Sequence, residues 1–224
     1  CWLSSILRLC ALNNMLLDIV QLLKQYNIKP DAVLQPGAHY GQEQSVYDEL
    51  GIPDDNRFYF EPQKDVFEIL SRNVGKRGHL FNFALGNDNK KVVMNIERDN
   101  QSQSSSILEP SLHLQQYPHI RFTEKEEVNM FRLDDIFPSN KLNNNWLMNL
   151  DCQGFELEVL KGSQKILPYV KALVCEVNRA EVYKGCPMVG EIDEFLLKFQ
   201  FARLEIDWSQ GITWSDAFYF KTII

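Results

Sequence analysis

Positive charge is scarce in this 224-residue chain. Its 23 Lys and Arg residues stand against 30 Asp and Glu residues, which gives a formal net charge of -7 at pH 7. No cluster of Lys and Arg occurs along the sequence. Proteins that bind nucleic acid neutralise several phosphates with clustered basic side chains, so the sequence disfavours nucleic acid as substrate or partner.

Cysteine is scarce as well. The five cysteines are odd in number, and no two of them form a CxxC pair. Because closely spaced pairs mark zinc sites and even sets mark disulfide frameworks, neither is expected here. Cys152 and Cys175 stand in apolar, strand-like runs and are predicted to be small core residues. The remaining three are Cys1, Cys10 and Cys186.

Long hydrophobic runs are also missing. No stretch approaches the roughly 20 apolar residues that a membrane-spanning helix needs. Residues 1–12 are apolar, but Arg8 interrupts them and no small-residue cleavage site stands out, unlike in a secretory signal. We therefore expect a cytoplasmic protein without a membrane span.

The apolar residues that are present make up 45% of the chain, enough for the core of one domain. Between Met15 and Tyr26 they recur at helical spacing, which predicts an amphipathic helix that stops before Pro30. The expected organisation is an N-terminal helical segment, residues 1–29, packed on a domain formed by residues 30–224.

Strand-like and helix-like segments alternate along this domain. Strands are predicted at residues 32–34, 57–61, 79–85, 92–96, 128–131, 145–151, 170–177, 201–206 and 217–221, and helices at residues 66–74, 155–167, 189–199 and before Leu50. Strand and helix in alternation imply crossover connections, hence a doubly wound α/β fold with a mainly parallel sheet. Only a loop separates the last two strands, so we expect them to pair antiparallel.

One segment, residues 98–127, breaks this rhythm. It is long, polar and rich in Ser and Gln, and it lies between two predicted strands. Long insertions of this kind are functional loops or disordered segments. A helical pattern at residues 108–116 favours a partly ordered lid.

A glycine-containing turn, residues 35–42 (QPGAHYGQ), follows the first predicted strand and opens a helix. Glycines allow a tight turn and a close approach of a ligand, although they can also serve packing alone. Glu61 ends the next strand about 20 residues on, where an acid binds ribose hydroxyls in doubly wound folds. Together they predict an adenosine-containing cofactor. The full GxGxxG fingerprint is absent, which favours a nucleoside without a pyrophosphate over NAD.

Four motifs resemble those of the FkbM-type methyltransferases: residues 36–42 (PGAHYGQ), 60–62 (FEP), 84–87 (ALGN) and above all 150–162 (LDCQGFELEVLKG). The last is similar to the family signature D-x-Q-G-x-E-x-x-V-L-x-G. Two further matches are residues 133–135 (LDD) and Glu176. The resemblance covers nearly the whole domain.

The resemblance implies a seven-stranded, Rossmann-like class I methyltransferase fold, S-adenosylmethionine as methyl donor, and O-methylation, often of sugar hydroxyls. By the same resemblance Glu61 holds the ribose of the donor. The other expected donor-binding residues are Gln35, Gly37, Ala38, His39, Gly41, Pro62, Ala84, Leu85, Ser105 and Asp151. One departure is Gln35, because the family usually has Asp there; an amide can still accept a hydrogen bond from the ammonium group of the donor, but a charged group binds it more strongly.

Two carboxylates at strand ends are the candidate catalytic residues. Ligands of open α/β sheets bind at the carboxyl ends of the strands, where Asp151 and Glu176 are predicted to lie. Asp151 is the first choice as general base for the acceptor hydroxyl and Glu176 the second. Asp151 would equally suit the N-cap of the helix that follows it. Gln153 and Glu156 would orient this turn or bind substrate.

Weaker candidates lie around the same crevice. His39, His113 and His119 are loop histidines that would act as catalytic groups only if they face the crevice. Ser104, Ser105 and Ser106 could donate hydrogen bonds, and Tyr183, Trp208 and Trp214 could stack on a sugar. No spacing typical of a metal site occurs, so no metal is expected.

Three functional hypotheses stand side by side. The first is an O-methyltransferase with a carbohydrate or similar small hydroxyl compound as acceptor. The second is a degenerate domain of the same fold that binds the donor or a glycan without catalysis, as the departure at Gln35 would allow. The third is an NAD-dependent oxidoreductase, which the missing glycine of GxGxxG disfavours.

Overall fold

The computed structural model describes residues 17–137, 145–208 and 213–222. The described part of the N-terminal segment forms α2 (Ile19–Gln25), which begins where Asp18 accepts a hydrogen bond from the Gln21 N–H. Residues 1–16 lie outside the described residues, and they include the apolar run of residues 1–12, Cys1, Cys10 and the start of the predicted helix at Met15.

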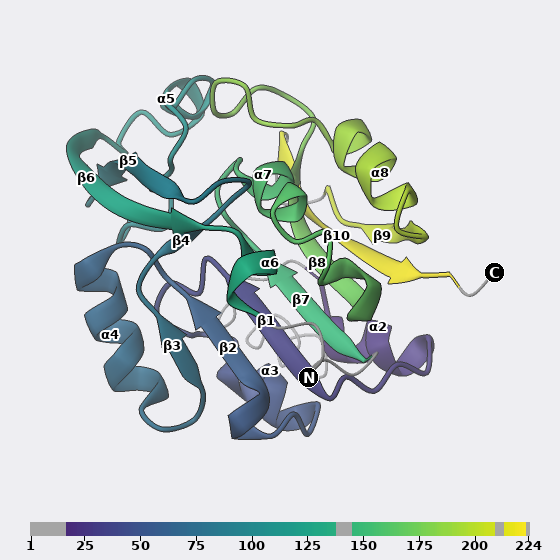
Figure 1. Cartoon of the computed structure of the whole chain (residues 1–224). Helices are drawn as coiled ribbons and strands as arrows, with labels where there is room; N and C mark the ends of the chain where they lie inside the picture. The colour runs from purple at the N-terminus through teal and green to yellow at the C-terminus, as the bar shows by residue number, and fades with distance from the viewer. Residues whose placement is uncertain (1–16, 138–144, 209–212, 223–224) are drawn as a thin grey trace, which may run out of the picture.

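A seven-stranded sheet forms the centre of the molecule, in the order β3-β2-β1-β7-β8-β10-β9 (Figure 1). Neighbouring strands pair in parallel along β3, β2, β1, β7 and β8, and β10 runs antiparallel to both β8 and β9. The predicted doubly wound, mainly parallel sheet with an antiparallel last strand is therefore confirmed. The strands are β1 (Ala32–Pro36), β2 (Arg57–Phe60), β3 (His79–Phe81), β7 (Trp146–Leu150), β8 (Val170–Asn178), β9 (Phe201–Ile206) and β10 (Trp214–Lys221).

Helices cover both faces of this sheet. Apolar side chains of α2, α3 and α4 pack on one face, and those of α6, α7 and α8 pack on the other. Among the described residues no helix is both long enough and apolar enough to cross a membrane. The helices are α3 (Gln44–Glu49), α4 (Lys64–Val74), α6 (Leu133–Ile136), α7 (Glu156–Lys161) and α8 (Val189–Leu197), with the 3-10 turns η1 (Asp54–Asn56) and η3 (Leu167–Tyr169).

The two cores follow from the alternation of side chains along buried strands. Val33 and Leu34 are neighbours in β1, both fully buried, and they belong to different cores. Successive side chains of a strand point to opposite faces, so a continuous apolar run supplies both cores. Burial of each such aliphatic side chain stabilises the fold by about 1.5–3 kcal/mol.

A second, three-stranded sheet has the order β4-β6-β5 and was not predicted. Its strands are β4 (Ala84–Leu85), β5 (Lys90–Glu97) and β6 (Phe122–Phe131). The sequence predicts one strand over residues 79–85, which is wrong: β3 belongs to the main sheet and β4 to the second. The chain breaks at Asn82, whose side-chain amide donates to the carbonyls of Glu61 and Pro62.

The insertion between β5 and β6 is shorter than the expected lid of residues 98–127. Strand β6 begins at Phe122 and pairs with the whole of β5, so only residues 98–121 lie outside strands. Polar residues occupy both faces at the start of β6, which is why the sequence pattern does not show a strand there. The expected helical island is also shorter, because only α5 (His113–Gln116) is helical.

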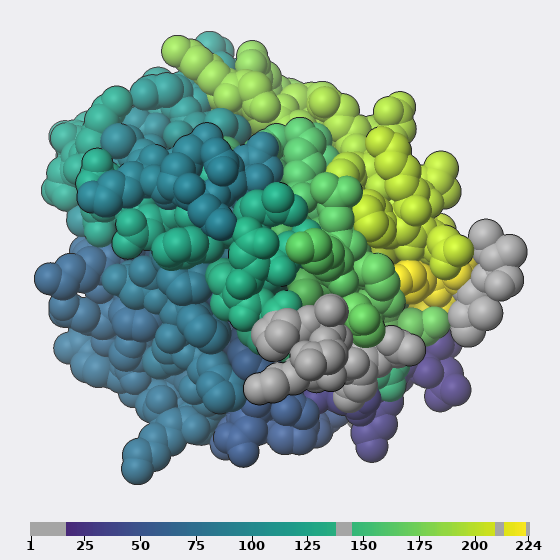
Figure 2. Space-filling model, in the orientation of Figure 1, coloured from purple at the N-terminus to yellow at the C-terminus, as the bar shows by residue number. Residues whose placement is uncertain are grey.

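The helix predicted over residues 155–167 ends early, at Lys161. The next residue, Gly162, packs so closely on the second sheet that a Cβ atom there would lie 1.8 Å from the Gly86 carbonyl oxygen. In the space-filling view the side chains of the second sheet lie against those of α6 and α7 (Figure 2). Gly162 is thus the C-cap of α7, and it packs against the turn that follows β4.

Candidate active site

The turn after β1 brings the carboxyl ends of β1 and β7 together. Gly37 has a φ of 74°, and a Cβ atom on it would lie 1.7 Å from the Asp151 carbonyl oxygen. Gly41 has the same φ, and its Cβ would meet the side chains of Leu70 and Val74 at 3.0 and 3.1 Å. Packing of the chain on itself thus explains both glycines, since a side chain would find no space there and glycine adopts this backbone at the lowest cost.

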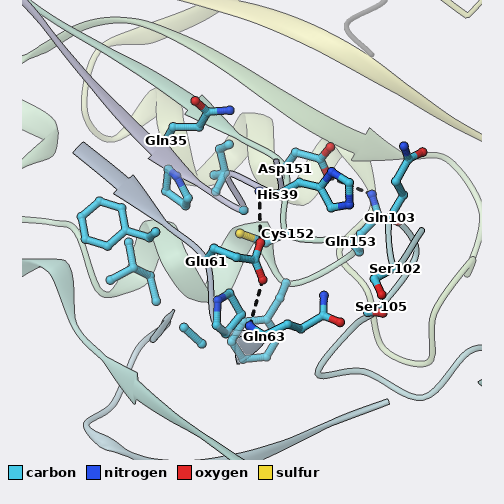
Figure 3. A pocket seen from close by; sticks show the side chains of 18 of the residues that line it. Gln35, His39, Glu61, Gln63, Ser102, Gln103, Ser105, Asp151, Cys152 and Gln153 are labelled. Carbon is cyan, nitrogen blue, oxygen red and sulfur yellow. Dashed lines mark hydrogen bonds between the residues drawn. The ribbon is translucent and has the colours of Figure 1, made fainter. Parts of the chain in front are cut away.

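A cleft with a volume of about 1030 Å³, including its open mouth, lies at this turn (Figure 3). The carboxyl ends of β1, β2 and β7 form one wall, and residues 102–107 of the insertion form another. Nine of the expected donor-binding residues line it: Gln35, Gly37, His39, Glu61, Pro62, Ala84, Leu85, Ser105 and Asp151. Ala38 and Gly41 do not, because they are buried in the packing of the turn.

Glu61 lies in this cleft as expected. Its carboxylate accepts hydrogen bonds from the His39 N–H at 3.0 Å and the Gln63 N–H at 2.9 Å (Figure 3). Burial raises the pKa of Glu61 to about 8, against the effect of these two bonds. Gln63 also lines the cleft, and its side-chain oxygen accepts no hydrogen bond from the described residues.

His39 has both ring nitrogens engaged. The Gln42 amide contacts Nδ1 at 2.8 Å, and Nε2 contacts the Gln101 carbonyl oxygen at 2.8 Å. A carbonyl only accepts, so the Nε2 proton is donated to it and Nδ1 accepts from Gln42. His39 thus ties the insertion to the glycine turn and has no free nitrogen for proton transfer.

Gln35 is almost fully buried, and both the nitrogen and the oxygen of its amide are hydrogen-bonded. Its Nε2 donates to Glu43 Oε2 at 2.6 Å, and its Oε1 accepts from the Tyr47 hydroxyl at 2.8 Å. Glu43 lines the cleft beside it and was not predicted as a site residue. Burial raises the pKa of Glu43 to about 7. A carboxylate therefore lies in this corner of the cleft, although the strand end itself carries an amide.

The two predicted catalytic carboxylates are joined by Gln153. Its Nε2 donates to Asp151 at 2.8 Å and to Glu176 at 2.9 Å, and its Oε1 accepts from the Tyr183 hydroxyl at 2.9 Å. The φ of Gln153 is 50°, a left-handed conformation that these bonds hold in place. Gln153 therefore fixes the position of both carboxylates.

These carboxylates titrate above their ordinary range. Asp151 is accessible from the cleft but surrounded by protein, and burial raises its pKa. Burial and the nearby carboxylates of Asp151, Glu156 and Asp216 raise the pKa of Glu176 well above its usual value. Asp216 lies directly opposite Glu176 in the pairing of β10 with β8, a contact between strands that the sequence does not reveal.

The alternative role of Asp151, as cap of α7, is wrong. Phe155 is the N-cap residue of α7, and no side chain caps this helix. The Glu156 side chain instead braces the turn before the helix, because its Oε1 accepts from the N–H groups of Cys152 and Gly154. Oxygen atoms of Asp151, Glu156 and Glu176 lie within 4.8 Å of one another. No such acidic cluster was expected from the sequence, where Glu176 is far from the other two.

A second cavity adjoins the cleft and shares Gln103, Asp151, Gln153 and Asp216 with it. Trp208 is not among its lining residues and lies with its ring 4.6 Å from the Arg179 guanidinium carbon. Of the weaker candidates, the cavity is lined by Ser104, His113, His119, Tyr183 and Trp214. Ser106 does not line it but donates to the Gln153 carbonyl at 2.7 Å.

Known proteins resemble this chain in sequence and in fold. A model of the Methyltransferase FkbM domain matches residues 35–202. The 2-O-methyltransferase NoeI of Sinorhizobium fredii (strain NBRC 101917 / NGR234) is 30% identical over 191 residues, which cover 82% of this chain and 76% of that protein.

Two solved structures share the fold at 8% sequence identity. An uncharacterized protein from Listeria monocytogenes serotype 4b has a TM-score of 0.52, covering 94% of this chain and 70% of that one. Magnesium protoporphyrin IX methyltransferase from Synechocystis PCC 6803, solved with bound S-adenosylmethionine, has a TM-score of 0.51, covering 91% and 76%. At this identity the likeness concerns the fold alone.

Proposed function

The chain belongs to the FkbM methyltransferase family, and we propose that it transfers a methyl group from S-adenosylmethionine to a hydroxyl oxygen of a sugar, a glycan or a similar small molecule. The relative NoeI carries the name of a 2-O-methyltransferase, which supports oxygen as the atom methylated. The acceptor is proposed to be a small molecule or glycan rather than nucleic acid, in line with the acidic balance of the chain.

The charge of the cleft is the observation that carries the proposal. Glu43, Glu61, Asp151 and Asp216 line it, and none of the described lining residues is Lys or Arg. S-adenosylmethionine carries a sulfonium and an ammonium group against one carboxylate, so its net charge is positive and suits a cleft lined by carboxyl groups without a basic side chain. NAD carries a pyrophosphate, which such a lining would repel. The chemistry of these side chains therefore fits the methyl donor.

The residues that would hold the donor divide by chemistry. Glu61 has the remaining lone pairs to accept ribose hydroxyl bonds, and Gln63 offers an unused carbonyl oxygen beside it. Glu43 and Asp151 would attract the positively charged end of the donor. An apolar wall would take the adenine, formed by Phe83, Ala84, Leu85, Met94, Ile107 and Phe155.

The chain's part in the chemistry is to position the hydroxyl and to accept its proton. The donor, when bound, supplies a methyl group on a positively charged sulfur. During transfer the proton of the acceptor hydroxyl would pass to the Asp151 carboxylate. The raised pKa of Asp151 makes it a stronger base than an ordinary carboxylate. Gln153 keeps this base in one orientation, which lowers the entropic cost of the reaction.

The degenerate alternative has less support. It rests on Gln35, where the family usually has an acid, but the Glu43 carboxylate lies 2.6 Å from the Gln35 amide in the same cleft. A negative charge is thus available to the donor despite the departure.

The test is calorimetric titration of the chain with S-adenosylmethionine, S-adenosylhomocysteine and NAD, followed by acceptor screening. We expect micromolar binding of the first two and none of NAD, and loss of binding in Glu61→Ala. With binding established, a set of hydroxyl compounds should yield S-adenosylhomocysteine. A chain that binds the donor but produces none with any glycan or small-molecule acceptor would count against an enzyme and favour the binding module.

A further inference from the structure

The second cavity identifies the acceptor more closely, given the proposed function. We infer that the methyl acceptor binds in this cavity as an uncharged glycosyl unit, one without a phosphate, sulfate or carboxylate group.

The position of the cavity suits an acceptor because it meets the donor cleft at the proposed base. Asp151, Gln153 and Asp216 line both spaces, so a hydroxyl at this junction lies beside Asp151 whichever space its ring occupies. Methyl transfer needs the two substrates in contact at one point and separate elsewhere. Two adjoining spaces with one shared wall meet this requirement.

The charge of the cavity excludes anionic acceptors. Asp151, Glu176 and Asp216 line it, and among the described lining residues there is no Lys or Arg. Proteins recognise phosphate and carboxylate groups with Arg, Lys or clustered backbone N–H donors, which form charge-assisted hydrogen bonds. An anionic group here would face three carboxyl groups, with no Lys or Arg among the described lining residues to compensate it. A phosphorylated, sulfated or acidic sugar is therefore disfavoured.

The remaining side chains suit a ring with both apolar faces and hydroxyl groups. Tyr117 and Trp214 offer aromatic surface, whereas Tyr183 is fully buried. The Trp214 indole N–H donates to the Tyr117 hydroxyl at 3.0 Å, which fixes the two rings relative to each other. The C–H faces of a sugar stack on such rings. Asn100 and Gln103 add amide groups that both donate and accept, as hydroxyls require.

The insertion builds this cavity and is anchored to the main domain around it. Pro110 forms a bridge with Tyr183, and the Thr213 hydroxyl donates to the Gln116 side chain at 2.9 Å. The buried Glu97 carboxylate accepts from the N–H groups of Asn100 and Ser104, which holds the first turn of the insertion. The cavity is thus preformed, and its selectivity is a property of fixed walls.

The experiment uses the full chain and pairs of acceptors that differ only in charge. The methyl glycosides of glucose, galactose, mannose and N-acetylglucosamine are each compared with their 6-phosphates, and methyl transfer from labelled S-adenosylmethionine is measured. Trp214→Ala, Trp214→Phe and the control Trp208→Ala, outside the cavity, are assayed alongside, and donor affinity is measured by calorimetry for every variant.

We expect transfer to neutral glycosides and at least a hundredfold less to their phosphates. Trp214→Ala should raise the acceptor KM by about tenfold, with donor affinity unchanged, and Trp214→Phe should restore it because an aromatic face remains. Equal or faster transfer to phosphorylated acceptors, or an unchanged KM in Trp214→Ala, would overturn the inference and leave the proposed function standing. No transfer to any compound, by a chain that binds the donor, would overturn both.

Discussion

Gln35 donates a hydrogen bond of 2.6 Å to Glu43, a residue that follows it by eight positions and lies in the wall of the same cleft. Both side chains are buried, and the Tyr47 hydroxyl holds the other end of the Gln35 amide. The pair therefore works as a unit in which the amide orients and the carboxylate carries the charge. Because of this pairing, Gln35→Asp is not expected to improve the site, although Asp is the residue that the family usually has at this position.

Gln35→Asp is expected to weaken the protein rather than repair it. The variant would place a second carboxylate beside Glu43 and remove the bond to Tyr47, leaving two buried acids without a donor between them. We expect a loss of about 1–3 kcal/mol in the free energy of unfolding, measured by chemical denaturation at pH 8. The loss should shrink at pH 5, where a proton is shared. Tighter donor binding by the variant would contradict this account. It would support the hypothesis of a degenerate domain without catalytic activity.

Glu43 predicts how donor affinity depends on pH. Its pKa is raised to about 7 by burial, so the carboxylate is protonated below that value and charged above it. A positively charged donor should therefore bind more tightly as pH rises from 6 to 8. In Glu43→Gln this part of the pH dependence should disappear, which calorimetry across the same range measures. The control is Glu49→Gln, an exposed acid of α3; an identical profile in both variants would argue against the role.

The same pKa implies a cost for ligand-free stability. A carboxyl group whose pKa is raised in the folded state loses stability as pH rises from its unfolded value of 4.5 through about 7. The full difference corresponds to about 3 kcal/mol, present above pH 7 and absent below about pH 4. Glu43→Gln should therefore stabilise the ligand-free chain at pH 8 relative to wild type, but not at pH 4. Thermal unfolding at the two pH values separates this effect from donor binding.

Asp151→Asn should abolish proton acceptance while keeping the hydrogen bond from Gln153. We expect kcat to fall by about 10²- to 10⁴-fold with little change in donor affinity. Glu176→Gln is the matched comparison, because it lines only the acceptor cavity and should cost much less. The wild-type rate should rise with pH through the raised pKa of Asp151, and this limb should vanish in the variant. Equal losses of kcat in both variants would indicate that Asp151 and Glu176 act together as the base.

Gly37→Ala tests why the turn carries a glycine. Its Cβ atom would lie 1.7 Å from the Asp151 carbonyl oxygen, so β1 and β7 would have to separate. Gly51 has nearly the same φ, 72°, but nothing lies within 4 Å of a Cβ there. Gly51→Ala should cost about 1–2 kcal/mol for its backbone alone, and Gly37→Ala considerably more. Similar costs would mean that backbone conformation, and not strand contact, requires the glycine.

The sequence predicted the main sheet because its signals are local. Continuous apolar runs mark strands buried on both faces, and the turn residues and Glu61 fall at strand ends by simple counting. Glu43, Asp216 and the second cavity could not be found in this way. Glu43 reaches the cleft through the path of the turn, and Asp216 meets Glu176 through antiparallel pairing. Both depend on tertiary contacts that no residue pattern encodes.

The polar insertion is a second part of the structure that residue patterns do not reveal. Its strand residues in β6 are mostly exposed, so no apolar alternation marks them. Their pairing with β5 is nevertheless what brings residues 98–121 over the sheet and closes both spaces. At the glycine turn the sequence predicted too much. Its motif favoured contact with a ligand, but Gly41 does not line the cleft and is explained by packing alone.

Metal removal should leave activity unchanged. Asp151, Glu156 and Glu176 are close enough to bind a divalent cation, but Gln153 already directs an amide donor at two of them, and Glu156 is held by two backbone N–H groups. A cation would have to displace these donors, which are already in place around the three acids. We therefore expect equal rates with EDTA and with added Mg²⁺. Loss of transfer in EDTA and its recovery with Mg²⁺ would instead make this acidic group a metal site, with Gln153 turned to present its oxygen.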